Sequence, residues 1–427
     1  MGFATALFQA VSIALWLFGI DLRHDVRMTN HHNILLTWEL GGGLGHLARL
    51  RPLALKLAGA GHSVILALRH STYNANMPAG LVVVPAPASP KAREAIAEPV
   101  SIADILHNEG ASDARQLAAQ VRAWRGLFDV LRPDVVVMDY SPIALLALQG
   151  LEPARITLGT GFASPPAVSP LPNLREWQNH YPDRIQRTED TLLNALNEQL
   201  SKQDQPALNC VGELFERVDA TLLATFPELD HYPQRHHGEY VGTWSDLTGQ
   251  EPEWPAADGP RVFVYLKPFR GLPRLLDQLA ARSLPSLIYI GGQVPTERWQ
   301  GSSLRFADHP VDMEATAQGC DLAILHAGHG TTAAMLLAGK PILQLPIHVE
   351  QYHNALATER LGAGRMLLLN QGDRLPAVLD DLLTDRSAAA SARRFAETHR
   401  NQHSHAALLD VADRIIKLPP PRTTRKS

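Results

Sequence analysis

A glycine-rich turn near the start of the chain carries a histidine suited to proton transfer. The apolar run 33–38 leads into Gly41-Gly-Gly-Leu-Gly-His46, and a helical pattern follows. Histidine can take a proton from a hydroxyl because its ordinary pKa is about 6.5. Asp139 ends another apolar run, where a carboxylate reaches the ligand-binding edge of a parallel sheet. We predict that Asp139 orients His46 as a general base; the alternative is a helix cap and a turn before Pro142.

A second turn, in the other half of the chain, has the composition of an anion site. An apolar run leads into His326, and Gly328 and Gly330 leave backbone N–H groups accessible. Thr331 and Thr332 add two hydroxyl groups. Free N–H groups and the dipole at a helix start attract an anion, each charge interaction being worth roughly 0.3 to 1 kcal/mol. The turn predicts a phosphate site, and a plain turn that needs small residues is the alternative.

An acid and an amide stand side by side a short distance downstream. Glu350 and Gln351 follow the apolar stretch 341–347, at the expected start of a helix. A carboxylate and an amide in this arrangement can hydrogen-bond two adjacent hydroxyl groups of a sugar. Together with the phosphate turn, the pair points to a ligand that carries both a phosphate and a sugar.

The stretch 321–355 closely resembles the donor-binding half of the inverting GT-B glycosyltransferases, the family of the UDP-glucuronosyl and macrolide transferases. In that family the motifs read HGGxGT, GxPxxxxP, D/E-Q and N-A; here they read HAGHGTT, GKPILQLP, EQ and NA. The resemblance implies an α/β fold of two Rossmann-like domains facing a central cleft. It also implies that the C-terminal domain binds the nucleotide-sugar.

The resemblance further implies a role for each of these residues. His326 would touch the donor diphosphate, while Glu350 and Gln351 would bind the sugar. The phosphate cradle would consist of Gly328, Gly330, Thr331 and Thr332. The turn before His46 is similar to the family's first βα unit, where that histidine faces the acceptor, and Asp139 resembles the aspartate of the catalytic dyad.

Two features of the nucleotide site depart from the family pattern. The family's first strand of this domain ends in a phosphate loop with serine and glycine, whereas Tyr265-Leu-Lys267-Pro stands here. We predict that Lys267 supplies a charge where the hydroxyl is missing. The family's tryptophan-containing base motif is absent ahead of residue 321, so UDP and dTDP both remain as donor nucleotides.

A metal site is the alternative use of the histidines in this half of the chain. Imidazoles and a carboxylate recur at metal-like spacing: His326, His329, His348, Glu350 and His353. A phosphate site also explains the glycines and threonines, and the resembled family works without a metal ion. We therefore predict no metal and no cofactor, with the nucleotide-sugar as a co-substrate. Another group, His231, His236 and His237, is predicted to lie in a solvated loop.

Composition narrows the remaining function classes. The chain has 427 residues, 45% hydrophobic and 19% charged, as in globular proteins of two or three domains. Its 39 basic and 43 acidic residues give a formal net charge of −4, so no nucleic-acid partner is expected. Cys210 and Cys320 stand far apart, which indicates neither a disulfide framework nor a thiolate metal site and fits a reducing compartment.

The elements that must position these residues follow from alternating apolar and helical stretches, which are typical of parallel α/β sheets. The first series predicts strands at 33–38, 63–68, 81–84, 134–138 and 154–158, with helices at 46–59, 113–131 and 141–149. An exposed proline-rich loop at 164–172, a helix at 184–217 and a strand at 220–225 follow. The second series predicts strands at 261–266, 285–290, 302–306, 321–325, 341–345 and 364–368.

Domain boundaries follow from these series. We predict an acceptor-binding domain at 28–241, a linker at 242–260, a nucleotide-sugar-binding domain at 261–417 and a disordered tail at 418–427. Residues 1–27 are expected outside the fold as an extension or weak anchor, because the apolar run 3–20 is at the lower limit for a membrane span. The expected location is the cytoplasm, with peripheral contact to the inner face of the membrane as an option.

These observations predict a hexosyltransferase-type glycosyltransferase that acts with inversion and without a metal ion. Its donor would be a UDP- or dTDP-sugar, and its acceptor a hydroxyl of a small molecule, a lipid or a saccharide. Two alternatives remain: a nucleotide-sugar epimerase-type enzyme on the same fold, and a non-catalytic activator of a partner transferase.

Overall fold

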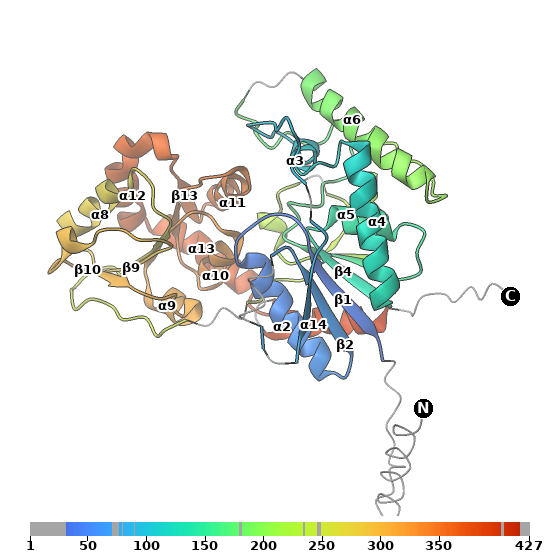
Figure 1. The fold of residues 1–427 in the computed structure, drawn as a ribbon. Coiled ribbons are helices and arrows are strands. Elements are labelled where there is room, and N and C mark those ends of the chain that lie inside the picture. Colours follow the sequence, from blue (N-terminus) through green and yellow to red (C-terminus); the bar gives the residue numbers. More distant parts are fainter. Residues whose placement is uncertain are drawn as a thin grey trace, which may run out of the picture.

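The computed structural model describes residues 31–70, 77, 78, 80–88, 90–178, 182–233, 235–245, 249–402 and 405–418. Two α/β domains lie side by side within these ranges (Figure 1). The predicted extension 1–27 lies outside the described residues, as does the predicted tail except for Leu418.

The N-terminal sheet has seven strands, all parallel, in the order β3-β2-β1-β4-β5-β6-β7. A parallel sheet covered on both faces needs strands that are apolar throughout, and in β1 and β4 nearly every residue is buried. The strands are β1 (Asn33–Trp38), β2 (Ser63–Leu68), β3 (Val82–Pro85), β4 (Val135–Asp139), β5 (Ala154–Gly159), β6 (Ala220–Leu223) and β7 (Glu239–Tyr240).

Helices cover both faces of this sheet and bury two separate apolar cores. Most pack on one face, around the buried ring of Trp124, whereas α2 lies on the other. The helical segments are α2 (Gly45–Gly59), α3 (Ile102–Asn108), α4 (Ala114–Leu131), α5 (Pro142–Leu148), α6 (Pro182–Ser201), α7 (Glu213–Glu216) and the 3₁₀ turn η2 (Pro227–Leu229).

The C-terminal sheet repeats the same design with six parallel strands in the order β10-β9-β8-β11-β12-β13. Its strands are β8 (Val262–Leu266), β9 (Ser286–Ile290), β10 (Leu304–Ala307), β11 (Leu322–Leu325), β12 (Ile342–Gln344) and β13 (Gly364–Met366). The remaining segments are α8 (Leu272–Ala281), η3 (Glu297–Trp299), α9 (Met313–Gly319), α10 (His329–Leu337), α11 (Val349–Arg360), η4 (Leu369–Arg374), α12 (Leu375–Thr384), α13 (Arg386–Thr398) and α14 (His405–Lys417).

Both sheets have the strand order of doubly wound dinucleotide-binding domains, so the predicted pair of Rossmann-like domains is confirmed. In such sheets ligands bind at the carboxyl ends of the strands where the order reverses. That position falls between β1 and β4 in one domain and between β8 and β11 in the other. The two histidine-containing turns predicted from the sequence follow β1 and β11.

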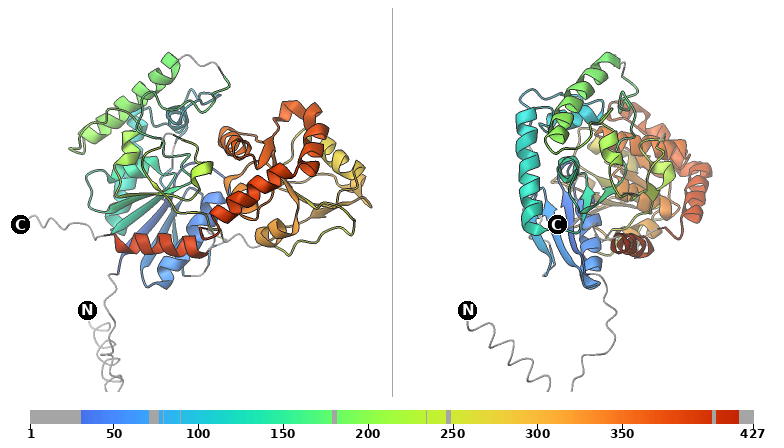
Figure 2. Two further views of the ribbon diagram at one scale, coloured as in Figure 1. Left: turned by 180° about the vertical axis from the view of Figure 1, so that it is seen from behind. Right: turned by 90° about the vertical axis from the view of Figure 1, so that its right-hand side faces the viewer.

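The last helix belongs in space to the N-terminal domain. Figures 1 and 2 show α14 beside α2, and Val411 and Ile415 are buried in the core that also contains β1. The sequence assigned residues 261–417 to the C-terminal domain, and for α14 this was wrong. Its apolar periodicity predicts one buried face but does not say which sheet covers it. Conversely, Leu229 of η2 and Phe226, which precedes η2, pack into the core of the C-terminal domain.

Three segments of the chain differ from their predicted form. The helix predicted at 184–217 ends at Ser201, and turns around Pro206 separate it from the short α7. The loop at 164–172 is irregular as predicted, but Pro165 and Pro166 are buried rather than exposed. The predicted linker is divided between the domains, since Trp244 packs on the N-terminal core and Trp254 on the C-terminal core.

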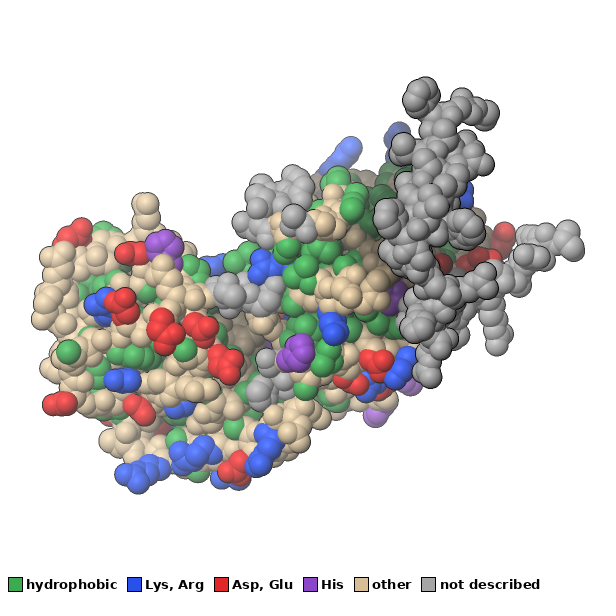
Figure 3. Space-filling view, turned by 90° about the horizontal axis from the view of Figure 1, so that it is seen from below, with side chains coloured by type: hydrophobic (Ala, Val, Ile, Leu, Met, Phe, Trp, Pro, Cys, Tyr) green, Lys and Arg blue, Asp and Glu red, His purple; other side chains and the backbone are tan. Residues whose placement is uncertain are grey.

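Surface charge is mixed in sign on the face that Figure 3 shows. Acidic and basic side chains are interspersed over the C-terminal domain there, without one wide area of a single charge. Among the described helices, none combines the length and the apolar character needed to cross a membrane.

Ile415→Ala tests the docking of α14. The substitution removes buried methyl and methylene groups of the Ile415 side chain, which is expected to lower the free energy of unfolding by about 2 to 4 kcal/mol. Amide hydrogen exchange should quicken in β1, β2 and α2, with β8 to β11 unchanged. Asp413→Ala on the exposed face of the same helix is the control. Faster exchange in the C-terminal sheet instead would contradict this packing.

Candidate active site

The two residues of the predicted dyad meet at the carboxyl edge of the N-terminal sheet. Trp38 and Asp139 are register partners on the neighbouring strands β1 and β4, and α2 begins one residue before His46. The Nδ1 atom of His46 lies 2.9 Å from Oδ1 of Asp139. The structure therefore brings together two residues that are 93 positions apart.

The His46 ring is fixed by its neighbours. It stacks on Trp38, with ring centroids 4.8 Å apart and planes inclined by 22°. Gly41 passes close by at a positive φ of 82°, and a Cβ there would lie 3.1 Å from Nε2 of His46 and 3.0 Å from the Tyr140 ring. Only glycine fits this approach without strain. The Nε2 atom makes no hydrogen bond within the described ranges, and the side chain is 19% exposed.

Arg49 is a third member of this group that the sequence analysis missed. Its Nη1 donates to Oδ2 of Asp139 at 2.5 Å, so both carboxylate oxygens have a partner. Burial alone would raise the pKa of Asp139, but the charges and hydrogen bonds of His46 and Arg49 hold it below its ordinary value. Arg49 follows His46 by three residues on α2, a spacing that places both on one helix face and could have revealed it.

The predicted phosphate turn joins β11 to α10 in the C-terminal domain. Gly328 is the N-cap, and the space beside Gly330 is open, because a Cβ there would meet no atom within 4 Å. The first N–H groups of a helix have no partner inside it and are available to an anion. Thr331 donates its hydroxyl to the Gly328 carbonyl at 3.0 Å.

Thr332 does not take the predicted place at the phosphate site. Its side chain is buried, and its hydroxyl accepts from the Gln344 amide at 3.4 Å in the domain interior. One residue along a helix turns a side chain by roughly 100°, which directs Thr332 away from the open side of the turn. The sequence placed two adjacent threonines at the site, and the structure directs Thr332 into the core.

His326 lies at the end of β11 with both ring nitrogens facing main-chain carbonyls. Nδ1 is 2.6 Å from the oxygen of Leu345, and Nε2 is 3.3 Å from that of Lys267. The edge of the ring meets Phe269 at 5.8 Å between centroids. A side-chain contact to a diphosphate requires Nε2 to leave the Lys267 carbonyl. The Lys267 side chain itself is exposed at the end of β8.

Glu350 and Gln351 occupy the first turn of α11. Burial raises the pKa of Glu350, while the charges of His46 and Arg49 oppose this rise and that of Asp139 adds to it. The dyad and Glu350 therefore act on one another across the boundary between the domains. Gln351 uses its amide oxygen to accept from the Ile347 N–H at 3.0 Å, which leaves its NH₂ group for a ligand.

The helices α10 and α11 are the part of the C-terminal domain that faces the N-terminal domain (Figure 1). Nε2 of His329 lies 2.7 Å from the hydroxyl of Thr225, which follows β6. His353 on α11 bonds the Leu174 carbonyl at 2.8 Å. Burial, followed by nearby His231 and Arg49, holds the pKa of His329 well below its ordinary value, so its ring is neutral.

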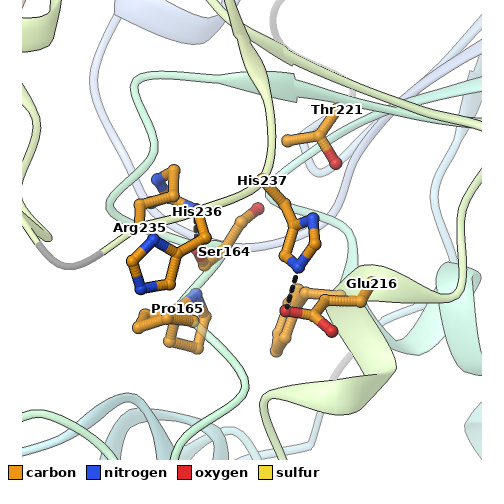
Figure 4. Close-up of a pocket in the computed structure, with 9 residues that line it drawn as sticks. Ser164, Pro165, Glu216, Thr221, Arg235, His236 and His237 are labelled. Atoms are coloured by element: carbon orange, nitrogen blue, oxygen red, sulfur yellow. Dashed lines mark hydrogen bonds and ion pairs between the residues drawn. The ribbon is translucent and has the colours of Figure 1, made fainter.

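The histidines at metal-like spacing do not converge. Within the described residues no three side chains of His, Cys, Asp or Glu are placed to hold one metal ion. A separate pocket opens on the N-terminal domain, where His237 faces Glu216 at 3.5 Å (Figure 4). None of the residues that line it belongs to the predicted site.

Comparisons with known proteins relate the chain to enzymes that transfer sugars. Residues 293–408 match the glycosyltransferase family 28 C-terminal domain. A PGL/p-HBAD biosynthesis glycosyltransferase of Mycobacterium tuberculosis is 26% identical over 309 residues, 67% of this chain and 71% of that protein. A PGL/p-HBAD biosynthesis rhamnosyltransferase of Mycobacterium bovis is 27% identical over 274 residues, 59% of this chain and 60% of that protein.

Solved structures share the fold over most of the chain. The calicheamicin glycosyltransferase CalG4 superimposes with a TM-score of 0.68 at 18% identity, covering 90% of this chain and 98% of its own. The glycosyltransferase VinC in complex with dTDP gives 0.63 at 17%, covering 90% and 99%. Fold, domain match and relatives together place the chain among the GT-B glycosyltransferases, as the sequence predicted. Within that class, its C-terminal half carries a family 28 domain.

Asp139→Asn tests the charge of the buried carboxylate. Because folding lowers the pKa of Asp139 below the ordinary 3.8, its contribution to stability is present above that value and is lost as pH falls through the folded pKa. The wild type should be more stable than the variant at pH 7, and the two unfolding free energies should converge in acid. Asp258→Asn, at an exposed carboxylate, is the control. Parallel curves for Asp139→Asn and wild type would contradict the account.

Proposed function

We propose that this glycosyltransferase moves a sugar from a UDP- or dTDP-sugar to an acceptor hydroxyl, inverts the anomeric carbon and needs no metal ion. The observation that carries the proposal is the His46–Asp139 pair. The Nε2 atom of His46 makes no hydrogen bond in the described ranges, and the charges of both residues act on Glu350 of the other domain.

The acceptor is activated by proton transfer to His46. Arg49 fixes the carboxylate of Asp139, and that carboxylate fixes Nδ1 of the His46 imidazole, so Nε2 is the atom that takes the hydroxyl proton. Asp139 remains ionised and stabilises the imidazolium that forms. This arrangement is expected to contribute about 10² to 10⁴ in rate.

The donor is cleaved in the same step. The acceptor oxygen forms a bond to the anomeric carbon while the bond from that carbon to the diphosphate oxygen breaks, and the electron pair leaves with the diphosphate. In this step the N–H groups at the start of α10 and the ammonium group of the exposed Lys267 stabilise the negative charge. Glu350 and the free amide NH₂ of Gln351 bind the sugar hydroxyls. One displacement at one carbon inverts its configuration.

Similar proteins favour one donor nucleotide but do not narrow the chemical class of the acceptor. The complexes of VinC with dTDP and of SsfS6 with thymidine diphosphate favour a dTDP-sugar. The acceptor is a hydroxyl-bearing small molecule, lipid or saccharide, and neither a nucleic acid nor a cofactor takes part. We place the enzyme in the cytoplasm, with peripheral membrane contact through the apolar run 3–20, which lies outside the described residues.

His46→Ala tests the base. In buffer with EDTA, kcat for donor consumption should fall by about 10² to 10⁴, because no other group takes the proton. Calorimetric binding of UDP or dTDP should be unchanged, because His46 belongs to the other domain. His237→Ala is the control at an exposed histidine. Full activity in His46→Ala would refute the assignment, and a wild type that binds nucleotide without consuming any donor would favour the non-catalytic alternative.

Gly330→Asp tests the phosphate site, because it is expected to raise the stability of α10 and to lower the affinity for nucleotide. A carboxylate in the first turn of α10 should stabilise the helix by about 0.3 to 1 kcal/mol. The same charge occupies the open side of the turn, so nucleotide affinity should fall at least about ten-fold, which is about 1.4 kcal/mol. Gly330→Asn, similar in shape but uncharged, separates charge from volume. Unchanged affinity in both variants would place the diphosphate elsewhere.

A further inference from the structure

Among the described residues, a buried histidine at the boundary between the domains has no hydrogen-bond partner for its ring. The sequence placed His231 in a solvated loop with His236 and His237, and for His231 this was wrong. His231 is only 6% exposed, whereas His236 and His237 both lie at the surface. The physical reason is that His231 follows η2, which is inserted into the core of the C-terminal domain.

Both ring nitrogens of His231 are buried without a partner in the part of the chain that the structure describes. The main chain of Thr160 is nearby but outside hydrogen-bond geometry. Burial lowers the pKa of His231 to about 4, so at pH 7 the ring offers one donor and one acceptor. Unpaired polar atoms in a protein interior are destabilising and are uncommon, which points to a partner that is a ligand.

The surroundings of His231 place it at the meeting point of both domains. Its ring meets Phe162 edge-on at 5.3 Å and His353 of α11 at 6.3 Å between centroids. Burial is the main cause that lowers the pKa of His329 in the phosphate turn, and the nearby His231 lowers it further. Thr160 directly follows Gly159, whose Cβ, if present, would lie 3.5 Å from Oδ1 of Asp139. His231 therefore lies beside Phe162 of the N-terminal domain and beside α11 and the phosphate turn of the C-terminal domain.

The residues on either side of His231 hold it in place. Asp230 accepts from Nε of Arg235 and from the Tyr240 hydroxyl, both at 2.8 Å. Tyr232 donates its hydroxyl to the Phe162 carbonyl at 2.9 Å. An imidazole supported in this way is preorganised, so little further ordering is needed when it binds a ligand.

We propose that His231 is a substrate-binding residue that hydrogen-bonds a hydroxyl group held between the two domains. The hydroxyl belongs either to the sugar being transferred or to the acceptor, since both carry the same chemistry. The inference rests on the proposed transferase function and adds to it a residue that comes from the N-terminal domain and faces the donor side.

The test pairs two substitutions that separate binding from packing. His231→Phe keeps a ring of similar size and removes the unpaired nitrogens, so Tm should stay equal or rise while kcat/KM falls about ten- to one-hundred-fold. His231→Gln restores a donor and an acceptor and should recover part of the loss. Calorimetric binding of UDP or dTDP should match wild type in both. His237→Gln is the matched control on the same loop.

The kinetics of His231→Phe identify which hydroxyl is bound. Loss of donor hydrolysis without any acceptor assigns the contact to the sugar, whereas a raised KM for acceptor alone assigns it to the acceptor. A kcat/KM within two-fold of wild type in the Phe variant overturns the proposal. A lower Tm in both variants, with activity falling in proportion, also overturns it, because His231 is then structural. A wild type without nucleotide binding or donor consumption instead defeats the proposed function itself.

Discussion

The buried carboxylate of Asp139 is the interaction on which the proposed chemistry depends. It lies at the end of β4, and its two oxygens bind His46 and Arg49 of the neighbouring α2. A buried charge is strongly destabilising unless it is paired and hydrogen-bonded, so the aspartate constrains α2 as much as α2 constrains the aspartate. The glycine at position 41 serves the same geometry, because any larger residue would push on His46. Strand, turn and helix therefore form one rigid unit.

Contacts between the domains bring this unit and the donor site to one place. The first turn of α10 meets Thr225 through His329, and α11 meets the Leu174 carbonyl through His353. These contacts come from the same two helices whose first turns are proposed to bind phosphate and sugar. The chain also returns to the N-terminal domain at its end, because α14 follows the C-terminal sheet in sequence and packs on the N-terminal sheet. Neither domain is built from one continuous stretch of chain, which couples their positions.

Local patterns predicted the parts of the structure that depend on neighbours in sequence. Apolar runs located the strands, and the order of parallel strands then brought His46 to Asp139. The remaining features depend on distances in space. Arg49 was missed although its spacing from His46 was visible, and Thr332 was placed at the phosphate turn because a sequence does not show which way a helical hydroxyl points. Nothing in the sequence separates buried His231 from its exposed neighbours, since tertiary packing alone decides the difference.

The stereochemistry of donor hydrolysis tests the central claim most directly, because water replaces the acceptor and no acceptor needs to be known. Purified protein with EDTA would be given the α-anomers of UDP- and dTDP-sugars, and the released sugar would be followed by proton NMR before it equilibrates. A single displacement assisted by His46 predicts that the β-anomer appears first. Release of the α-anomer first would require retention of configuration and would contradict the account.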